Sequence, residues 1–350
     1  MKYPKFLQKN GTIGFVAPSF GCSIEPYHTA FLNAIKKWEE QGYQTHLGPN
    51  CFASEGIGIS NKPELCGKEL NEWYCSKEND VLISCGGGEL MCEVVPYMDF
   101  EAMKQAEPKW YMGFSDNTNF TFLSPILLDT AAIYGPCAAA FGMEPWHASI
   151  QDAWDLLCGE KDYVDGYELW EREGLKDEEH PLLPYNVTEK RVLRNFICEN
   201  GLAKECENAS IKIEGRLIGG CMDILQMYPG TPFDKVKEFN EKYKEDGFIW
   251  FMEACELNVM AIRRAIWQMK QAGWFSYVKG FLIGRPLCFG EEAFGIDQYR
   301  AVTDLLSEYN VPIIMDLDIG HFAPTMPIIC GSTAQVSVNG NDIKIKYTYQ

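Results

Sequence analysis

Apolar positions in the first third of the chain follow two different spacings. Short apolar runs that end in small residues predict strands, and apolar residues three or four positions apart predict helices. The predicted strands are TIGFVAPS, THLGP, DVLISCGGGEL and KWYMGFSD, and the predicted helices are EPYHTAFLNAIKKWEEQGY, which Gly42 ends, and NKPELCGKELNEWYCS. This alternation is typical of an open parallel α/β sheet.

The rest of the chain begins with a charged stretch. Residues 160 to 210 are rich in charge and have no sustained period, which indicates a long connection. Strand patterns follow it, and VNGND predicts a hairpin with Asn339 and Gly340 at its turn. We therefore expect an α/β domain over residues 1–165, a connecting region over 166–209 and a strand-rich domain over 210–350.

Composition and charge narrow the classes of function. The chain has 350 residues, 46% hydrophobic and 23% charged, which predicts two domains that are folded throughout. The net charge of -18 argues against nucleic acid and anionic membranes as partners, and favours a small molecule or peptide. Neither a secretory signal nor an apolar run long enough to span a membrane stands out, so we expect a cytoplasmic protein.

Fourteen cysteines are scattered along the chain, and no two have the C-x-x-C spacing of a zinc or redox site. We expect reduced thiols that act as small buried hydrophobic groups. This interpretation predicts no metal, no cofactor and no disulfide framework.

Ser115 lies in MGFSDNT, between a predicted strand and an apolar helical stretch. A serine on such a turn exposes its hydroxyl beside the N–H groups of a helix N-terminus, which suits acyl transfer. Asn117 breaks the hydrolase pattern G-x-S-x-G, and serine is also a common helix cap, so both interpretations stay open.

The glycines of CGGGEL come directly after a predicted strand. Met91 replaces the last glycine of G-x-G-x-x-G, so a dinucleotide site is not expected. Glycines at a strand end allow a backbone N–H to approach a ligand, and one here could complete an oxyanion hole with the serine turn. A tight loop with no ligand fits the same residues.

A serine nucleophile requires a base and an acid that orients it. His321 in DLDIGHFAP follows an apolar strand, whereas the other histidines fall in a predicted helix, near a strand start or in polar connections. Glu253 ends a strongly apolar strand, where a carboxylate is costly to bury without a partner, although it could instead reach solvent. The alternatives for the acid are Glu256, Asp316 and Asp318.

Taken together, these stretches resemble the LD-carboxypeptidase family of serine peptidases, which includes the microcin C immunity type. The resemblance is collinear from about residue 11 to 331. It is carried by IGFVAPS, SCGGGEL, MGFSDNT, YGP, GRLIGGCMDILQMYPGTP, FMEACELNVMAIRRAIWQM and GHFAPTMPIICG. It implies a flavodoxin-like parallel-sheet domain, a β-rich swivelling C-terminal domain and a homodimer.

The resemblance also implies roles for individual residues. Ser115 would be the nucleophile, His321 the general base and Glu253 its orienting acid. The oxyanion hole would be formed by the N–H groups of Gly87 and Asp116. Gly86, Gly88 and Trp170 would contact the substrate.

Two branches of the family differ in substrate. The murein-recycling branch usually has an arginine before its glycines and a tyrosine among them, where this chain has Cys85 and Gly88. YELWEREG resembles the loop of the immunity type, in which a tryptophan stacks on a nucleotide base. Trp170 would then be an exposed stacking ring, or else an aromatic residue that anchors a long loop.

We therefore expect a serine hydrolase that acts on aminoacyl- or peptidyl-nucleotides. The alternative is a carboxypeptidase that removes the terminal D-alanine of a murein tetrapeptide. A non-catalytic binding protein is a further alternative, and a thiol enzyme that uses Cys85 or Cys330 is a remote one.

Overall fold

The computed structural model describes residues 1–349, and the chain divides into two compact units. Unit 1 consists of Met1–Lys161, Glu173–Asn186 and Pro327–Cys330, and unit 2 of Asp162–Arg172, Val187–Met326 and Gly331–Gln350. Within residues 1–349, no helix is both long and apolar enough to cross a membrane.

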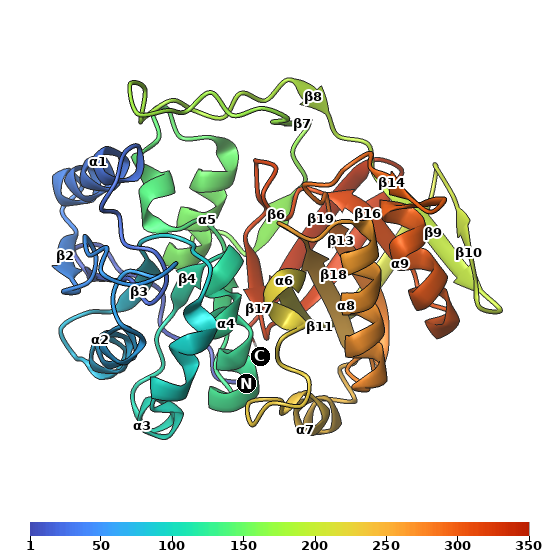
Figure 1. Cartoon of the computed structure of the whole chain (residues 1–350), viewed down its shortest axis with the longest axis horizontal. Helices are drawn as coiled ribbons and strands as arrows, with labels where there is room; N and C mark the ends of the chain where they lie inside the picture. Colours follow the sequence, from blue (N-terminus) through green and yellow to red (C-terminus); the bar gives the residue numbers. More distant parts are fainter. Residues whose placement is uncertain (350) are drawn as a thin grey trace. The chain divides into compact units, whose positions relative to one another are not determined.

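Unit 1 contains a six-stranded sheet in the order β17-β5-β4-β3-β1-β2 (Figure 1). Its strands are β1 (Thr12–Val16), β2 (Gln44–Leu47), β3 (Val81–Ser84), β4 (Tyr111–Gly113), β5 (Ala132–Tyr134) and β17 (Ile328–Cys330). All neighbours pair in parallel except β17 and β5. Without β17 the order is that of flavodoxin-like sheets, which confirms the predicted α/β class.

Helices alternate with the parallel strands of unit 1, and the apolar periodicity predicts the first two of these helices. The helices are α1 (Tyr27–Glu40), α2 (Pro63–Cys75), α3 (Phe100–Gln105), α4 (Thr118–Thr121) and α5 (Ala148–Cys158). Short helical turns are η1 (Met91–Glu93), η2 (Val95–Tyr97), η3 (Ser115–Asn117), η4 (Ser124–Leu128) and η5 (Ala138–Gly142). Helix α1 buries Trp38 against Phe15 of β1, with ring centroids 5.4 Å apart, and Gly42 follows the helix with a φ of +93°.

Unit 2 contains a nine-stranded sheet in the order β10-β9-β16-β13-β12-β11-β18-β19-β6. Its strands are β6 (Tyr163–Asp165), β9 (Arg194–Glu199), β10 (Leu202–Glu205), β11 (Ser210–Cys221), β12 (Phe248–Glu253), β13 (Val278–Gly284), β16 (Ile313–Leu317), β18 (Thr333–Asn339) and β19 (Asp342–Thr348). Strands β11, β12, β13 and β16 are parallel to one another, and the other pairs are antiparallel.

Two small two-stranded sheets and several helices complete unit 2. The strands are β7 (Leu169–Trp170) with β8 (Glu189–Lys190), and β14 (Glu292–Ala293) with β15 (Ile296–Asp297). The helices are α6 (Met222–Leu225), α7 (Val236–Lys242), α8 (Val259–Gln271), α9 (Gln298–Leu306) and η6 (Ser307–Tyr309). Helices α8 and α9 lie side by side (Figure 1).

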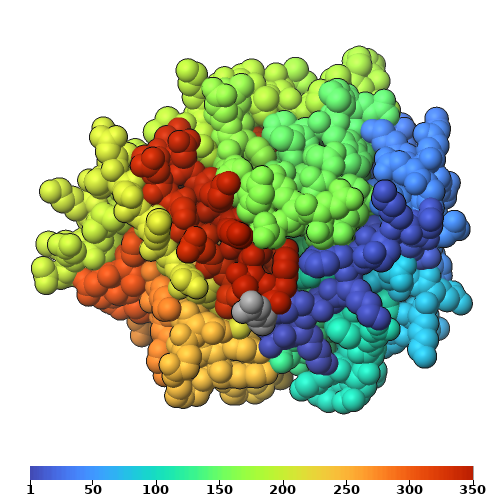
Figure 2. Space-filling model, turned by 180° about the vertical axis from the view of Figure 1, so that it is seen from behind, coloured from blue at the N-terminus to red at the C-terminus, as the bar shows by residue number. Residues whose placement is uncertain are grey.

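The C-terminal hairpin of β18 and β19 forms as predicted, with its turn one residue later. Asn339 pairs with Asp342, so Gly340 and Asn341 make the turn, and Gly340 has a φ of +59°. Buried and exposed residues alternate along both strands, so one face of the hairpin is open to solvent. Figure 2 shows this end of the chain, in red, on the surface.

The segment 166–209 is more structured than its composition suggests. It contains β7 to β10, and β9 pairs with β16 of the nine-stranded sheet. Strand β10 has no buried residue, and Arg194 of β9 forms an ion pair with Glu205 of β10. The charged residues that hide the strand periodicity in this stretch of sequence therefore belong to an exposed edge of the sheet.

Candidate active site

Ser115 lies on a strained turn directly after β4. Its φ is +61°, a left-handed conformation that costs free energy for any residue with a Cβ. The Ser115 N–H donates to the Tyr134 hydroxyl at 3.2 Å. Helix η3 begins at Ser115 and its N-cap residue is Phe114, so the structure disfavours the interpretation of Ser115 as a helix cap. A strained serine between a strand and a helix is the geometry of a nucleophile turn.

Asp116, the next residue, is buried and joins three segments around this turn. Its Oδ2 accepts from the Ser19 hydroxyl at 2.5 Å and from the Met91 N–H at 3.0 Å. Its Oδ1 accepts from Asn119 Nδ2 at 2.9 Å. Burial raises the pKa of the Asp116 carboxyl to about 6, although these hydrogen bonds favour the ionised form.

Asn117 connects the serine turn to the glycine loop. Its Nδ2 donates to the Gly86 carbonyl at 2.8 Å, and its Oδ1 accepts from the Tyr111 hydroxyl at 2.5 Å. Asn117, which breaks the hydrolase sequence pattern, therefore holds the glycine loop beside the serine.

The three glycines allow close packing within unit 1. A Cβ on Gly87 would lie 3.4 Å from Ser115 Cβ, and a Cβ on Gly88 would lie 2.3 Å from the Ser19 hydroxyl. The Gly87 carbonyl accepts from the Phe20 N–H, and the Gly87 N–H has no hydrogen-bond partner among residues 1–349. Gly87 thus lies beside the serine with a donor available, as an oxyanion hole requires.

Glu253 and His321 form a pair within unit 2. Glu253 ends β12 with its side chain 0% exposed, and its Oε2 lies 2.9 Å from His321 Nδ1. Burial alone would lower the pKa of the His321 imidazole, but Glu253 and Cys255 outweigh it and raise this pKa well above its usual value. Two glycines make room for the pair, because a Cβ on Gly320 would lie 2.8 Å from Glu253 Oε2 and one on Gly284 3.0 Å from Glu253 Cβ.

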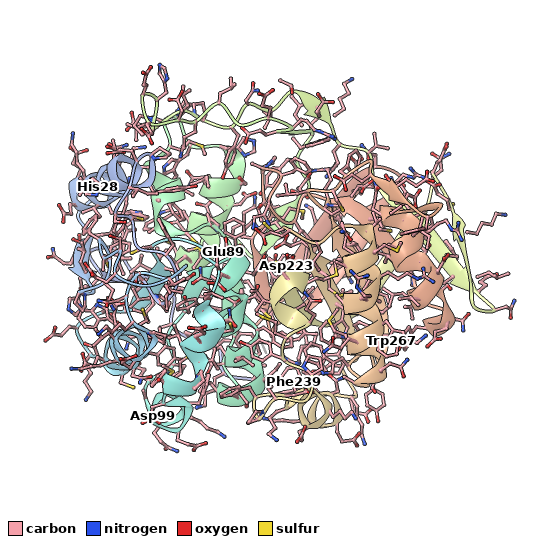
Figure 3. The ribbon with its side chains drawn as sticks, viewed as in Figure 1. His28, Glu89, Asp99, Asp223, Phe239 and Trp267 are labelled. Atoms are coloured by element: carbon pink, nitrogen blue, oxygen red, sulfur yellow. The ribbon has the colours of Figure 1, made fainter. Side chains whose placement is uncertain are left out.

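The alternative carboxylates have other partners. Glu256 is exposed, and its N–H donates to Asp223, which lies on α6 (Figure 3) and also accepts from the Cys255 N–H. Asp316 accepts from the Tyr299 hydroxyl at 2.6 Å, and Asp318 pairs with Arg285 at 3.0 Å. Within unit 2, Glu253 is therefore the carboxylate that can orient His321.

The other four histidines have local roles. His28 lies in α1 (Figure 3) and its ring contacts the Cys22 carbonyl, and His46 stacks on Trp73. His147 caps α5, and the exposed His180 pairs with Asp177. The structure also disfavours the remote alternative of a thiol enzyme. Cys85 and Cys330 are fully buried, and burial raises the pKa of the Cys85 thiol well above its usual value.

The expectation of an exposed Trp170 ring is wrong. Its side chain is 5% exposed and packs against Phe322 at a centroid distance of 5.2 Å and Phe289 at 5.7 Å. The Arg285 guanidinium lies 4.3 Å from the ring centroid. Its charged neighbours in sequence suggested exposure, but partners far along the chain cover the indole.

Ser19 and Tyr134 lie in stretches that carry the family resemblance, but nothing in the sequence indicates their contacts with the serine turn. Ser19 follows β1 and Tyr134 ends β5, and these strands are neighbours of β3 and β4 only in the folded sheet. Within residues 1–349, no three His, Cys, Asp or Glu side chains lie in an arrangement that could hold a metal ion.

Comparison with known proteins identifies the family of this chain. Residues 13–135 match the LD-carboxypeptidase N-terminal domain, and residues 214–336 match the LD-carboxypeptidase C-terminal domain. The chain is 24% identical to the microcin C7 self-immunity protein MccF of Escherichia coli, over 97% of this chain and 94% of that protein. It is 23% identical to a probable murein peptide carboxypeptidase of Bacillus subtilis strain 168, over 95% and 91%.

A solved structure of MccF in complex with aspartyl sulfamoyl adenosine has the same fold. The TM-score is 0.80 at 19% identity, and the match covers 100% of this chain and 99% of that one. Two family domains in the expected order together span most of the sequence. The chain therefore belongs to the LD-carboxypeptidase family of serine peptidases, and it is a hydrolase.

Proposed function

We propose that the protein hydrolyses an amide bond through an acyl-enzyme on Ser115, with His321 as general base and Glu253 as its orienting acid. The observation that carries this proposal is the pair in which Oε2 of the buried Glu253 lies 2.9 Å from His321 Nδ1. An Nδ1–H that donates to Glu253 leaves Nε2 of the imidazole as a proton acceptor. The strained turn at Ser115 supports the role of this serine as nucleophile.

Each proton transfer in the proposed reaction has a donor and an acceptor. Ser115 Oγ attacks the substrate carbonyl carbon while His321 Nε2 takes the hydroxyl proton. The N–H groups of Gly87 and Asp116 stabilise the oxyanion, and the same proton passes to the leaving nitrogen as the C–N bond breaks. Water, deprotonated by His321, hydrolyses the acyl-enzyme and regenerates Ser115.

The raised pKa of His321 sets the direction of the pH dependence. A general base must be neutral, so turnover should increase as the pH rises through the pKa of this imidazole. Because Glu253 and Cys255 hold that pKa well above the usual 6.5, the increase should occur above the pH at which an ordinary histidine titrates.

An aminoacyl-nucleotide is the substrate class that we favour. The relatives of this chain include MccF, which has been solved with aspartyl sulfamoyl adenosine. The murein tetrapeptide is the second candidate, supported by the likeness to the Bacillus subtilis carboxypeptidase. Stacking of a nucleobase on Trp170 is not part of the proposal, because the indole is buried.

Mass spectrometry of two parallel reactions tests the proposal. The purified protein is incubated with aspartyl sulfamoyl adenosine and, separately, with a murein tetrapeptide. Ser115→Ala is the inactive variant, and Ser276→Ala is a matched control on an exposed serine before the amino end of β13. We expect free aspartate from the first substrate with wild type and with Ser276→Ala.

Three results would change this conclusion. Release of D-alanine alone would assign the protein to peptidoglycan recycling. Undiminished cleavage by Ser115→Ala would exclude the serine mechanism. Cleavage of neither substrate, with calorimetric binding of one of them by both forms, would favour the non-catalytic binding protein.

A further inference from the structure

We infer that the segment Tyr167–Arg172 and Arg285 hold the loop that carries His321, so that Trp170 and Arg285 are positioning residues for the general base. This loop, Asp318–Ala323, follows β16 and is called the histidine loop below. The inference rests on the proposed role of His321. It gives Trp170 a function that differs from contact with substrate.

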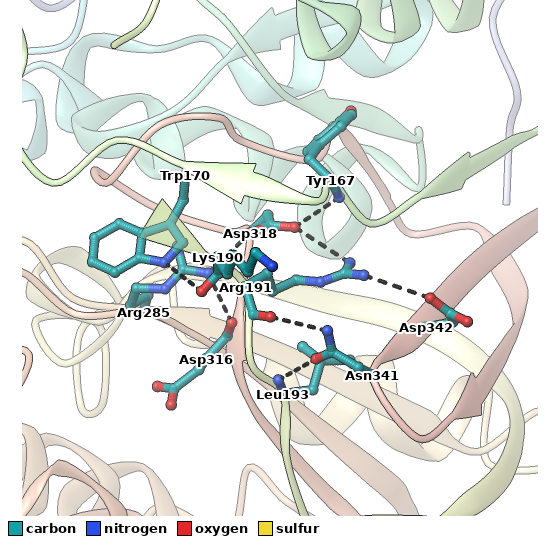
Figure 4. Close-up of polar contacts among 10 residues, drawn as sticks. All are labelled: Tyr167, Trp170, Lys190, Arg191, Leu193, Arg285, Asp316, Asp318, Asn341 and Asp342. Atoms are coloured by element: carbon teal, nitrogen blue, oxygen red, sulfur yellow. Dashed lines mark hydrogen bonds and ion pairs between the residues drawn. The ribbon is translucent and has the colours of Figure 1, made fainter. Parts of the chain in front are cut away.

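Two hydrogen bonds attach the segment to the histidine loop on either side of His321. The Tyr167 N–H donates to Asp318 Oδ2 at 2.9 Å (Figure 4). The Glu171 N–H donates to the Ala323 carbonyl at 2.6 Å. Because the two bonds flank the histidine, they restrict both the entry and the exit of the loop.

Trp170 packs against the histidine loop next to His321. Its ring contacts Phe322, the residue directly after His321, at a centroid distance of 5.2 Å. Its Nε1–H donates to the Lys190 carbonyl at 3.2 Å, which fixes the orientation of the indole (Figure 4). A ring with an occupied N–H and 5% exposure is a packing element.

Arg285 connects this tryptophan to the start of the histidine loop. Its guanidinium lies 4.3 Å from the Trp170 ring centroid, within the range of a cation–π interaction. Its Nη2 donates to Asp318 Oδ1 and to the Asp316 carbonyl, each at 3.0 Å. The Arg285 side chain is 2% exposed, so this arrangement is desolvated.

Arg191 completes the network from the other side of Asp318. Its Nη1 lies 3.5 Å from Asp318 Oδ2, and both side chains are nearly inaccessible to solvent. Two buried arginines thus share one buried carboxylate (Figure 4). Removing Asp318 would deprive both buried guanidinium groups of the carboxylate that they share, so the loop is tightly held while the network is intact.

The histidine loop needs this precision because it passes close to Glu253. Gly320 has a φ of +118°, and a Cβ there would lie 2.8 Å from Glu253 Oε2. The bond from Glu253 to His321 is 2.9 Å long, and a displacement of about 1 Å would break it. Misplacement of a catalytic group by about 1 Å can cost a rate factor on the order of 100.

Three substitutions test the inference: Trp170→Ala, Trp170→Phe and Arg285→Lys. Lysine keeps the charge of Arg285 but not the planar fork that bonds two oxygens and stacks on an indole. The matched controls are Trp267→Phe and Arg264→Lys, both on the exposed side of α8. Conservative variants guard against a simple failure to fold, which a urea unfolding curve would reveal.

Two readouts need no natural substrate. The first is the pKa of His321 from NMR of protein labelled at the histidine Cε1, assigned with His321→Gln. The second is the rate at which a fluorophosphonate phosphonylates Ser115 with loss of fluoride. Steady-state kcat and KM with aspartyl sulfamoyl adenosine are the third readout.

We expect the pKa of His321 to fall toward its ordinary value in Trp170→Ala and Arg285→Lys. Labelling and kcat should decrease on the order of 100-fold with KM unchanged. Trp170→Phe should retain most of the wild-type labelling rate and kcat, and the controls should match wild type.

An unchanged pKa of His321 in both Trp170→Ala and Arg285→Lys, or an effect on KM alone, would overturn the inference. If the wild type is neither labelled nor active, the proposed function fails, while the NMR titration still decides whether the network holds His321.

Discussion

Replacement of Asp116 by asparagine should change how the stability of unit 1 depends on pH. Asp116 is 1% exposed, and its carboxyl accepts from the Ser19 hydroxyl, the Met91 N–H and the Asn119 amide. All three donors are neutral, so no cation offsets the cost of burying the charge. Burial therefore raises the pKa of this carboxyl to about 6.

The size of the effect follows from linkage. The pKa is 3.8 in the unfolded chain and about 6 in the fold. At about 1.4 kcal/mol for each pKa unit, the difference amounts to about 3 kcal/mol. Since the folded state binds the proton more tightly, this stabilisation is fully present below pH 3.8. It is lost as the pH rises to about 6, and Asp116→Asn should abolish this dependence.

The assay is urea unfolding between pH 4 and pH 7, read by pulsed hydrogen exchange and mass spectrometry of peptides from β3 and β4. Glu69, a second buried carboxyl of unit 1 whose pKa burial raises to about 7, contributes equally to both proteins. The difference in unfolding free energy between wild type and Asp116→Asn therefore isolates Asp116. Because pH 4 lies just above the unfolded pKa of 3.8, this difference should fall by about 2.4 kcal/mol from pH 4 to pH 7. A difference that stays constant over this range would refute the reasoning.

Three further substitutions have definite expected outcomes. Ser115→Gly should relieve the φ of +61° and raise the unfolding free energy by about 1 kcal/mol while abolishing turnover, and a loss of stability in urea would contradict this. Glu253→Gln should lower kcat on the order of 10⁴-fold. It should also shift the rise of the pH–rate profile to lower pH, because the His321 imidazole loses the carboxylate that raises its pKa. An unshifted profile would argue against the pairing of Glu253 with His321. Gly88→Ala should lower the unfolding free energy by about 1–3 kcal/mol, since its Cβ would lie 2.3 Å from the Ser19 hydroxyl, and an unchanged thermal midpoint would show that the loop adapts.

Local patterns were sufficient to predict helices α1 and α2 and the first four strands of unit 1. The periodicity of YHTAFLNAIKKWEE predicts α1, and the apolar run VLIS predicts β3, because each element buries residues that are close in sequence. The turn at Ser115 was predictable for the same reason, since β4 and η3 are contiguous. The family resemblance then added the choice of His321 and Glu253.

The predictions failed where long-range packing decides the outcome. Glu168, Glu171 and Arg172 surround Trp170 in sequence and suggested a solvated ring, but Phe322 and Arg285 cover it in the fold. Likewise, β10 has no buried residue and the buried residues of β9 do not alternate strictly, so neither strand shows a period, although β9 is held by pairing with β16. A sequence pattern records what a segment buries, and it does not record which distant segment covers it.

The buried carboxylates of the two units differ in what they can tolerate. Asp116 is held by neutral donors, so it can bind a proton or be replaced by an amide at moderate cost. Asp318 faces the guanidinium groups of Arg191 and Arg285, and its removal would deprive two buried cations of the carboxylate that they share. The serine turn can therefore respond to pH through Asp116, whereas the histidine loop depends on a charge network that must remain complete.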